Sequence, residues 1–556
     1  MLNKKRYIFV MFFIVVVVLA IVLKLVMMSA VDHLFLKKQG EDRVERTVQQ
    51  HAYRGSIVDR NGYPLAVSTP VDSIWVNPLN VDIKSNSFQK VMLLLELSKE
   101  QQTNIIRRIK VREGRSGFVY LKRQVNPQIA SEISHMELLG VHLKREYKRY
   151  YPDGEVTSQV VGFTNIDNKG QEGIELIFND WLDGEGGHQN LWRDAKGNHV
   201  RILEGGKIPK HGNDIALSID RKIQYIAYKA LKESVVENHA LAGSVVVMDV
   251  KTGEVLAMVN QPSYNPNNMT TAFPDTMRNR VVTDVFEPGS VMKTFSAVAG
   301  LKSGEYTPES IISTSPGYYR VGKRTVRDFK NYGEMDLGYI LLKSSNVGIS
   351  KVILSLPPEA LPDTLREFGF GSATGIEFPG ERTGLVPSPT KWGEFPLATL
   401  SFGYGMNLTT LQLARGYAAL GNKGVMVKPT FIRINPGENI EKVEVVNDVV
   451  AEQVITMLQN VVEGKGGTGA KAKIWGYHVA GKTGTTRKAI AGGYATDDYM
   501  AVFAGLAPAT NPKLVIIVVV DDPKGESYGG GSVAAPIFAR IMSQSLRVLS
   551  VVPDKV

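Results

Sequence analysis

Residues 287–295 read EPGSVMKTF and place a serine three residues before a lysine, at the start of a helix expected to run to Leu301. Because residues i and i+3 share one helix face, Ser290 and Lys293 are predicted to be neighbours. A serine hydroxyl needs a base to become a good nucleophile, and a lysine with a lowered pKa can be that base. The helix start adds a positive dipole field. A lone Ser-x-x-Lys pair also arises by chance on many helices, so the stretch needs support from elsewhere in the chain.

Two further motifs supply that support. KSSN at residues 343–346 puts Ser344 54 residues after Ser290, and GKTGT at 481–485 puts Lys482 192 residues after Ser290. Ser-x-x-Lys, Ser-Asp-Asn and Lys-Thr-Gly are the signature of penicillin-binding proteins and class A β-lactamases. Only the central residue of the second motif departs, and Ser345 is expected to point away from the site if its two neighbours point inward. Three motifs in this order argue against a chance match.

On these motifs the chain resembles the active-site serine penicillin-recognising superfamily, and within it the membrane-anchored class B penicillin-binding proteins. Further stretches typical of that class lie outside the three motifs: RGSIVDRNG at 54–62, YYP at 150–152, GQEGIE at 170–175, SFGYG at 401–405, YGG at 528–530 and PIF at 536–538. The stretch AVSTPVDSIW at 66–75 favours the division-specific type over its elongation-specific relative.

The resemblance implies a serine-type D-Ala-D-Ala transpeptidase that cross-links peptidoglycan at the division septum. Ser290 would attack the D-Ala-D-Ala carbonyl of a stem peptide, and Lys293 would take the serine proton. Ser344 would relay a proton to the leaving D-alanine, with Lys482 setting the local field. A neighbouring stem-peptide amine would then resolve the acyl-enzyme, and β-lactams would acylate the same serine.

The resemblance also assigns substrate contacts. Asn346 would hold the peptide amide, and the hydroxyls of Thr483 and Thr485 would bind the terminal carboxylate, with Gly484 in the same substrate-binding stretch. The backbone N–H groups of Ser290 and Thr485 would form the oxyanion hole, where loss of one donor costs about 10²–10³ in rate. No metal and no organic cofactor is expected.

The amino-terminal segment predicts a membrane anchor. Residues 7–23 carry no charge, and with Lys24 as a snorkelling residue the apolar stretch reaches Met28. At 1.5 Å per residue these residues span about 33 Å, enough for a bilayer core of roughly 30 Å. The basic residues 4–6 should stay in the cytoplasm. A cleaved signal peptide is the alternative, but its apolar core is shorter and MSAV at 28–31 is a poor cleavage site.

Composition narrows the functional classes. The chain has 556 residues, with 43% hydrophobic and 22% charged, an ordinary globular mixture. Its net charge of +10 is dilute over this length, and an anionic polymer or a membrane face fits it as well as nucleic acid does. Cysteine is absent, which excludes disulfides, cysteine-ligated zinc, iron–sulfur clusters and thiol catalysis.

The expected fold class is α+β, with a single transmembrane helix, an elongated α+β pedestal and a transpeptidase domain. The glycine- and turn-rich stretch 184–213 predicts the junction between the two larger domains. The expected parts are a cytoplasmic tail 1–6, an anchor 7–28, a periplasmic pedestal of the dimerisation type 29–210, a transpeptidase domain 211–549 and a tail 550–556.

Local patterns add detail to these domains. Asn61-Gly62 between apolar stretches is typical of a hairpin. Strands early and late in the transpeptidase region, with helical sequence between them, predict one antiparallel sheet flanked by helices and an all-helical subdomain. The expected strands and helices of that sheet are strands 244–249, 254–259, 479–485, 499–506 and 514–520, and helices 218–235 and 536–549.

Two patterns suggest nucleotide or nucleic-acid binding but lack the required context. Residues 476–483 match G-x-x-x-x-G-K-[ST], a phosphate-binding loop that requires a helix opening at Lys482. A polar, glycine-rich stretch at 489–496 follows instead of a helical pattern. The basic clusters at 105–115 and 145–149 come without any nucleic-acid-binding signature. We therefore expect no nucleotide and no nucleic-acid partner.

The three motifs are also compatible with other functions. These are an elongation-specific transpeptidase, a D,D-carboxypeptidase or β-lactamase-like hydrolase, a β-lactam sensor, and a catalytically silent membrane scaffold. Turnover of a β-lactam would favour the hydrolase, and a folded protein that forms no penicillin adduct would favour the scaffold.

The resemblance also implies partners and a location. The partners are peptidoglycan stem peptides, lipid II-derived glycan, β-lactams, the SEDS-type polymerase FtsW and other division proteins. The location is the bacterial inner membrane, single-pass, with the amino terminus cytoplasmic and the bulk of the chain periplasmic at the septum. Arg54 and Arg60 are expected to act in partner binding rather than in acylation.

Overall fold

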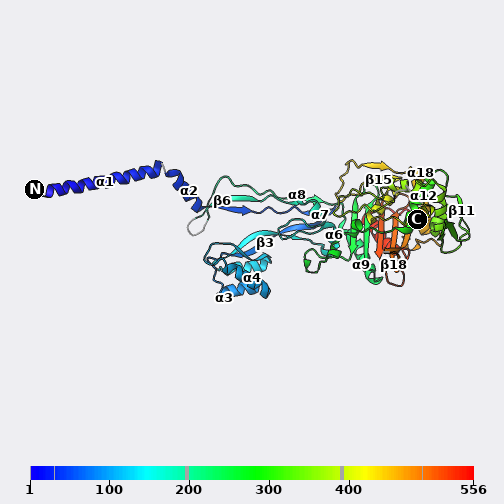
Figure 1. The fold of residues 1–556 in the computed structure, drawn as a ribbon, viewed down its shortest axis with the longest axis horizontal. Helices are drawn as coiled ribbons and strands as arrows, with labels where there is room; N and C mark the ends of the chain where they lie inside the picture. The colour runs from blue at the N-terminus through cyan, green and yellow to red at the C-terminus, as the bar shows by residue number, and fades with distance from the viewer. Residues whose placement is uncertain (1, 31, 194–198, 388–392, 491, 556) are drawn as a thin grey trace. The chain divides into compact units, whose positions relative to one another are not determined.

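The computed structural model describes residues 2–30, 32–193, 199–387, 393–490 and 492–555 (Figure 1). The chain forms two compact units, each built from separate stretches. The first unit comprises Met1–Arg54, Pro70–Tyr147 and Asp183–Asn213, and the second comprises Gly55–Thr69, Lys148–Leu182 and Asp214–Val556. The second unit therefore takes in two stretches from the range expected to form the pedestal.

The first unit begins with helix α1 (Leu2–Ala30), which contains the expected anchor. Its segment Lys4–Ala30 is long and apolar enough to cross a membrane, by length and composition. The most apolar part of this segment has no residue buried against the rest of the protein. A helix that is apolar on all sides and unburied is stable only in an apolar surrounding, which fits a membrane span. Helix α2 (His33–Val44) follows.

The rest of the first unit is α+β. One antiparallel sheet has the order β1 (Glu45–Gln50), β6 (Gly187–Arg193), β7 (His199–Ile202). Three helices pack with a second group of strands around a core that includes Val91, Ile105, Leu121 and Ile133. These elements are α3 (Asn86–Leu94), α4 (Lys99–Lys110), α5 (Pro127–His135), β4 (Val119–Val125), and the parts of β3 (Pro64–Val76) and β5 (Val141–Tyr150) in this unit.

The second unit is built on the antiparallel sheet that the sequence predicts (Figure 1). Its five strands lie in the order β10 (Val255–Gln261), β9 (Ala242–Asp249), β19 (Leu514–Asp521), β18 (Gly493–Ala507), β17 (Ala480–Ile490). Every neighbouring pair is antiparallel. The prediction that strands from both ends of this region join in one sheet is confirmed.

Strands β9, β10 and β19 are buried on both faces, which explains their nearly continuous apolar sequences. Val245 and Ile516 belong to one core with helices α9 (Arg221–Glu237) and α19 (Ala534–Val548). Val246 and Ile517 belong to a different core with helix α17 (Thr410–Gly421). Because side chains alternate along a strand, neighbouring residues face opposite cores. The two expected helices at 218–235 and 536–549 are therefore α9 and α19.

The part of the second unit that contains α17 is mainly helical. Its other helices are α12 (Lys293–Lys302), α13 (Leu337–Lys343), α14 (Asn346–Ser355), α15 (Ala360–Glu367), α16 (Glu394–Leu400) and α18 (Asp448–Glu463). Three two-stranded antiparallel sheets accompany them: β11 (Ile311–Ser313) with β14 (Glu334–Asp336), β12 (Tyr318–Val321) with β13 (Arg324–Arg327), and β15 (Val425–Val427) with β16 (Lys442–Glu444). This region is thus largely helical rather than all-helical.

The Asn61-Gly62 turn joins β2 (Ile57–Val58) to β3, as predicted. The Asp59 carboxylate accepts the N–H groups of Asn61 and Tyr63, both at 2.8 Å, which fixes the turn. Nearby, Arg54 is only 3% exposed, so its assignment to a partner-binding surface is wrong. Arg60 lies 3.5 Å from the buried carboxylate of Glu254. The Arg60 side chain is still 25% exposed, so its part in partner binding stays a prediction.

A buried ion pair in the second unit joins the residue before the YYP stretch to the last residue of GQEGIE. Arg149 Nε donates to Glu175 Oε1 at 2.6 Å, and the two side chains are 2% and 0% exposed. The short helices α6 (Ser158–Val161) and α7 (Gly173–Ile177) lie in the same region. A Cβ on Gly162 would come within 1.8 Å of the Glu172 carbonyl oxygen, so this close backbone approach requires glycine.

We predict that Glu175→Ala lowers the free energy of unfolding by about 3–5 kcal/mol, because it leaves the buried Arg149 charge without its carboxylate. Chemical denaturation of the detergent-solubilised protein would measure the change. Lys229→Ala is the control, since its pairing with Glu233 is exposed and should contribute about 0.5 kcal/mol or less. Equal effects from the two changes would contradict a structural role for the buried pair.

Candidate active site

The three motifs meet in the second unit. Ser290 lies in a short 3₁₀ turn, Gly289–Met292, and Lys293 is the first residue of α12. Ser344 ends α13 in a left-handed conformation with φ of 58°, and Lys482 lies in β17. The sequence predicts a continuous helix through Ser290, but the serine precedes the α-helix. Residues i and i+3 eclipse in a 3₁₀ turn, so Ser290 and Lys293 still share one face.

Two buried lysines converge on Ser344. Lys293 Nζ donates to the Ser344 carbonyl oxygen at 2.5 Å and to Ser344 Oγ at 3.1 Å. Lys482 Nζ donates to Ser344 Oγ at 3.0 Å and to the Thr483 carbonyl oxygen at 3.2 Å. Both lysines are 0% exposed. A hydroxyl oxygen has two lone pairs, so Ser344 Oγ can accept from both amines and still donate its own proton.

Burial changes the acid–base behaviour of both amines. Burial lowers the pKa of Lys293 well below its ordinary value, and the nearby Lys482 charge lowers it further, while Asp328 acts in the opposite direction. Burial lowers the pKa of Lys482 to about 7. The desolvated amine is less stable in its charged form, which is the cause in each case. The lowered pKa makes the neutral amine of Lys293, which can accept a proton, easier to form than that of a solvent-exposed lysine.

The side chain of Ser290 is half-buried and unengaged. Within the described residues its Oγ makes no hydrogen bond, so its lone pairs and its proton are available to an incoming group. Its nearest base by position is Lys293, one 3₁₀ turn away. The amine of Lys293 bonds Ser344, and among the described residues no hydrogen bond joins it to Ser290 Oγ.

The second motif is held by an acid that the sequence analysis missed. Asp328 accepts hydrogen bonds from Ser345 Oγ at 2.5 Å, Asn346 N at 2.6 Å and Val347 N at 3.0 Å. Ser345 is thus turned to Asp328 and not to the lysines, as predicted for the central residue. Asn346 Nδ2 donates to the Arg327 carbonyl oxygen at 3.2 Å. No motif marks Asp328, because the contact joins two segments that only the fold brings together.

The third motif forms the part of β17 that faces the 3₁₀ turn. Thr483 Oγ1 donates to Thr468 Oγ1 at 3.1 Å, and Thr485 Oγ1 accepts the Gly530 N–H at 2.9 Å. Thr485 is exposed, whereas Thr483 is buried. Thr468 was also missed by sequence analysis, whereas Gly530 belongs to a stretch already singled out. Residues 480–490 form one strand, so no helix opens at Lys482 and the phosphate-binding geometry is absent from this segment.

Glycines allow the backbone of the site to pack closely. A Cβ on Gly484 would lie 2.8 Å from the Pro288 carbonyl oxygen. A Cβ on Gly403 would lie 2.2 Å from the Gly289 carbonyl oxygen, and Gly289 N donates to the Gly403 carbonyl at 3.1 Å. Gly289 itself has φ of 61°, and a Cβ there would meet Thr486 Cγ2 at 2.2 Å. These approaches set the turn that carries Ser290 directly against β17 and the SFGYG stretch.

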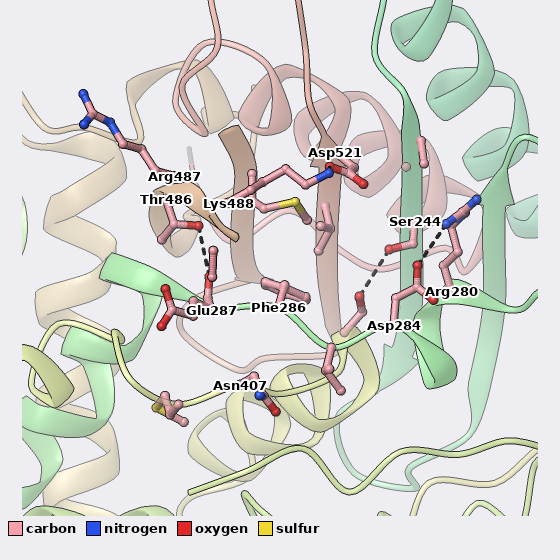
Figure 2. A pocket seen from close by; sticks show the side chains of 18 of the residues that line it. Ser244, Arg280, Asp284, Phe286, Glu287, Asn407, Thr486, Arg487, Lys488 and Asp521 are labelled. Atoms are coloured by element: carbon pink, nitrogen blue, oxygen red, sulfur yellow. Dashed lines mark hydrogen bonds and ion pairs between the residues drawn. The ribbon is translucent and has the colours of Figure 1, made fainter. Parts of the chain in front are cut away.

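A cavity of about 460 Å³ lies beside this turn (Figure 2). Glu287 and Thr486 are among its lining residues, and Thr486 Oγ1 donates to the Glu287 carbonyl at 3.0 Å. In Figure 2 Lys488 reaches across the cavity toward Asp521, its ion-pair partner at 2.8 Å, while Arg487 points away from the other labelled side chains. The cavity places charged groups of both signs close to β17.

Among the described residues no group of three or more His, Asp or Glu side chains is placed to hold a metal ion. The site residues are hydroxyls, amines, an amide and backbone groups. Such a set can carry out nucleophilic attack and proton transfer with its own side chains.

Comparison with known proteins agrees with this architecture. The family model of the penicillin binding protein transpeptidase domain matches residues 243–543, and that of the penicillin-binding protein dimerisation domain matches residues 49–217. The chain is 41% identical to the probable peptidoglycan D,D-transpeptidase PbpC of Pseudomonas aeruginosa, covering 99% of this chain and 96% of that protein. It is 40% identical to the peptidoglycan D,D-transpeptidase FtsI of Escherichia coli, covering 93% and 87%.

A solved structure is also similar over most of the chain. Penicillin binding protein 3 of Mycobacterium tuberculosis, complexed with aztreonam, matches with a TM-score of 0.69 and 28% identity, covering 92% of this chain and 99% of that one. A fold and site of this kind define a penicillin-binding protein with a transpeptidase domain. The chain belongs to the class B penicillin-binding proteins, which join that domain to a dimerisation domain.

We predict that Gly289→Ala slows acylation by a fluorescent penicillin about 100-fold, because the new Cβ forces the Ser290 turn away from β17. The rate of covalent labelling measures the effect. Gly304→Ala is the matched control, since Gly304 also has a positive φ of 77° but has nothing within 4 Å of a new Cβ. A similar loss in both variants would assign the effect to backbone strain rather than to the close approach.

Proposed function

We propose that this chain is a peptidoglycan D,D-transpeptidase of the division septum and acts through a serine acyl-enzyme. The observation that carries the proposal is the Ser344 hydroxyl shared by the buried amines of Lys293 and Lys482. In this proposal Lys293, whose pKa burial lowers, is the base for Ser290, and Ser344 is a second hydroxyl through which a proton can move. The FtsI name of a close relative supports the division role.

Acylation begins when Ser290 Oγ attacks the carbonyl carbon of the penultimate D-alanine, and the hydroxyl proton passes to Lys293 Nζ. The tetrahedral intermediate then collapses, and the bond to the terminal D-alanine nitrogen breaks. The leaving amine takes a proton through Ser344 Oγ, which Lys293 replenishes. In the second half, the amine of a neighbouring stem peptide attacks the ester, the new amide forms, and Ser290 regains its proton.

Substrate contacts follow the same proposal. The N–H groups of Ser290 and Thr485 stabilise the oxyanion, and Asn346 holds the peptide amide. Thr483, Gly484 and Thr485 receive the terminal carboxylate, next to the charge of Lys482. β-Lactams react with the same serine. The similar solved structure of penicillin binding protein 3 is itself complexed with the β-lactam aztreonam.

The partners and the location are also proposals. α1 anchors the chain in the bacterial inner membrane as a single pass, with the amino terminus in the cytoplasm and the bulk in the periplasm. The pedestal at 29–210 and the anchor bind the SEDS-type polymerase FtsW and other division proteins, and lipid II-derived glycan supplies the strands. The transpeptidase domain extends over 211–549, and the residues after it form a tail.

The proposed nucleophile can be tested directly. Incubation of the detergent-extracted protein with a fluorescent penicillin should give a stable adduct on Ser290, located by mass spectrometry. Ser290→Ala should form no adduct, and Lys293→Ala should reduce labelling by about 10²–10⁴-fold, because general base catalysis is lost. A folded wild-type protein without an adduct would favour the scaffold, and release of hydrolysed penicillin would favour a hydrolase.

The pH dependence of acylation tests the base. We expect the rate to fall as pH falls through the lowered pKa of Lys293, because the protonated amine cannot accept the Ser290 proton. Lys482→Gln removes a neighbouring cation that lowers the pKa of Lys293, so this acid limb should move to higher pH. Penicillin acylation rates measured across the pH range would show it. An acid limb that stays in place in Lys482→Gln would contradict the assignment.

A further inference from the structure

A basic hairpin lies beside the second motif and takes no part in the proposed chemistry. We define it as residues 318–330, which comprise β12, β13 and the three residues that follow. Its one acid is Asp328, and its five cations are Arg320, Lys323, Arg324, Arg327 and Lys330. Its net charge is therefore 5 − 1 = +4 in 13 residues, against +10 for the whole chain.

The five cations lack a carboxylate partner among the described residues. All of them are exposed, and within the described part of the chain none forms an ion pair with a carboxylate. Asp328 forms no ion pair with them among the described residues, and its carboxylate oxygens accept three hydrogen bonds from residues 345–347. A concentrated positive surface of this kind attracts an anionic ligand.

Aromatic rings alternate with these cations. Arg327 lies over the ring of Tyr318 at 5.9 Å and Lys330 over that of Tyr332 at 5.6 Å. Phe329 is 96% exposed, and half of Tyr318 is exposed as well. An aromatic ring held in solvent at this level is available to pack against an apolar face of a ligand. The combination suits a polymer that carries both anionic groups and flat C–H faces.

The hairpin is fixed in place on its inner side. Val321 and Val326 are buried in a small core with Val347 of α14 and Ala398 of α16. The Arg327 carbonyl accepts Asn346 Nδ2, and Asp328 holds the backbone of the same residue. A ligand on the outer side of the hairpin therefore lies next to the motif that carries Ser344 and Asn346.

From this placement we infer that the basic hairpin is a docking subsite for the peptidoglycan strand, separate from the contacts to the D-Ala-D-Ala end. The inference rests on the proposed function, since the adjacent site determines which anionic polymer arrives. Stem-peptide carboxylates would pair with the exposed cations, and sugar rings would pack on Phe329 and Tyr318. A small penicillin, which has no strand attached, would not need this surface.

Charge and aromatic variants of the full-length detergent-solubilised protein test the subsite. The first is Arg320→Gln with Lys323→Gln and Lys330→Gln, and the second is Phe329→Ala. The charge control is Lys222→Gln with Lys251→Gln and Arg433→Gln. These three control residues are exposed, have no ion pair among the described residues, and lie around α9, β9 and β10.

Binding is measured by co-sedimentation with uncross-linked peptidoglycan strands in a Ser290→Ala background, so that the result does not depend on turnover. We expect about tenfold weaker binding for the charge variant, equal to about 1.4 kcal/mol, and a smaller loss for Phe329→Ala. The control should bind as the parent does. In the Ser290-containing proteins, the KM for strands should rise while penicillin acylation stays unchanged.

Several results would overturn the inference. One is unchanged strand binding in the hairpin variants. Another is hairpin-dependent binding that is stronger to phosphatidylglycerol vesicles or to a single-stranded oligonucleotide than to the strands. Slower penicillin acylation in the hairpin variants would assign the residues to the catalytic site instead. Failure of the proposed function would give a different result. Neither the wild-type protein nor the hairpin variants would then form a penicillin adduct.

Discussion

The hydroxyl of Ser344 is the point on which the site depends. Two amines, both without solvent exposure, donate to this one oxygen. A buried ammonium group is costly unless it is neutralised or fully hydrogen-bonded, so the two lysines cannot both remain charged without compensation. Burial and the charge of Lys482 therefore lower the proton affinity of Lys293. Burial and the neighbouring charges of Lys482 and Asp328 together set the pKa of this base.

This packing needs segments far apart in the chain to approach at backbone distance. The Ser290 turn lies against β17 and the SFGYG stretch because Gly289, Gly403 and Gly484 carry no Cβ that would prevent it. The five-stranded sheet, whose strands β9, β10 and β19 are buried on both faces, supplies a rigid support for β17. The position of Lys293 relative to Lys482 on β17 thus depends on these glycines as well as on the two lysine side chains.

Much of this was accessible from sequence, and the limits have physical causes. The three motifs, the antiparallel sheet and the helices α9 and α19 follow from local patterns. The 3₁₀ turn at Ser290 and the left-handed Ser344 do not, because they depend on contacts across the fold. Asp328 and Thr468 have no motif of their own and become visible only when the segments meet. Arg54 was wrongly expected on a partner-binding surface. It lies in a recognisable motif and is charged, yet the fold buries it.

Asp328 connects the two surfaces of the site. Its carboxylate fixes the backbone of Asn346, while its charge raises the pKa of Lys293 against the effects of burial and Lys482. The same residue lies in the basic hairpin, whose other charged side chains are cations facing solvent. Since the hydrogen bonds from residues 345–347 hold this carboxylate in place, the position of the hairpin and the proton affinity of the base are physically linked. A displacement of the hairpin would therefore alter the field at Lys293 without any change in the lysine's own contacts.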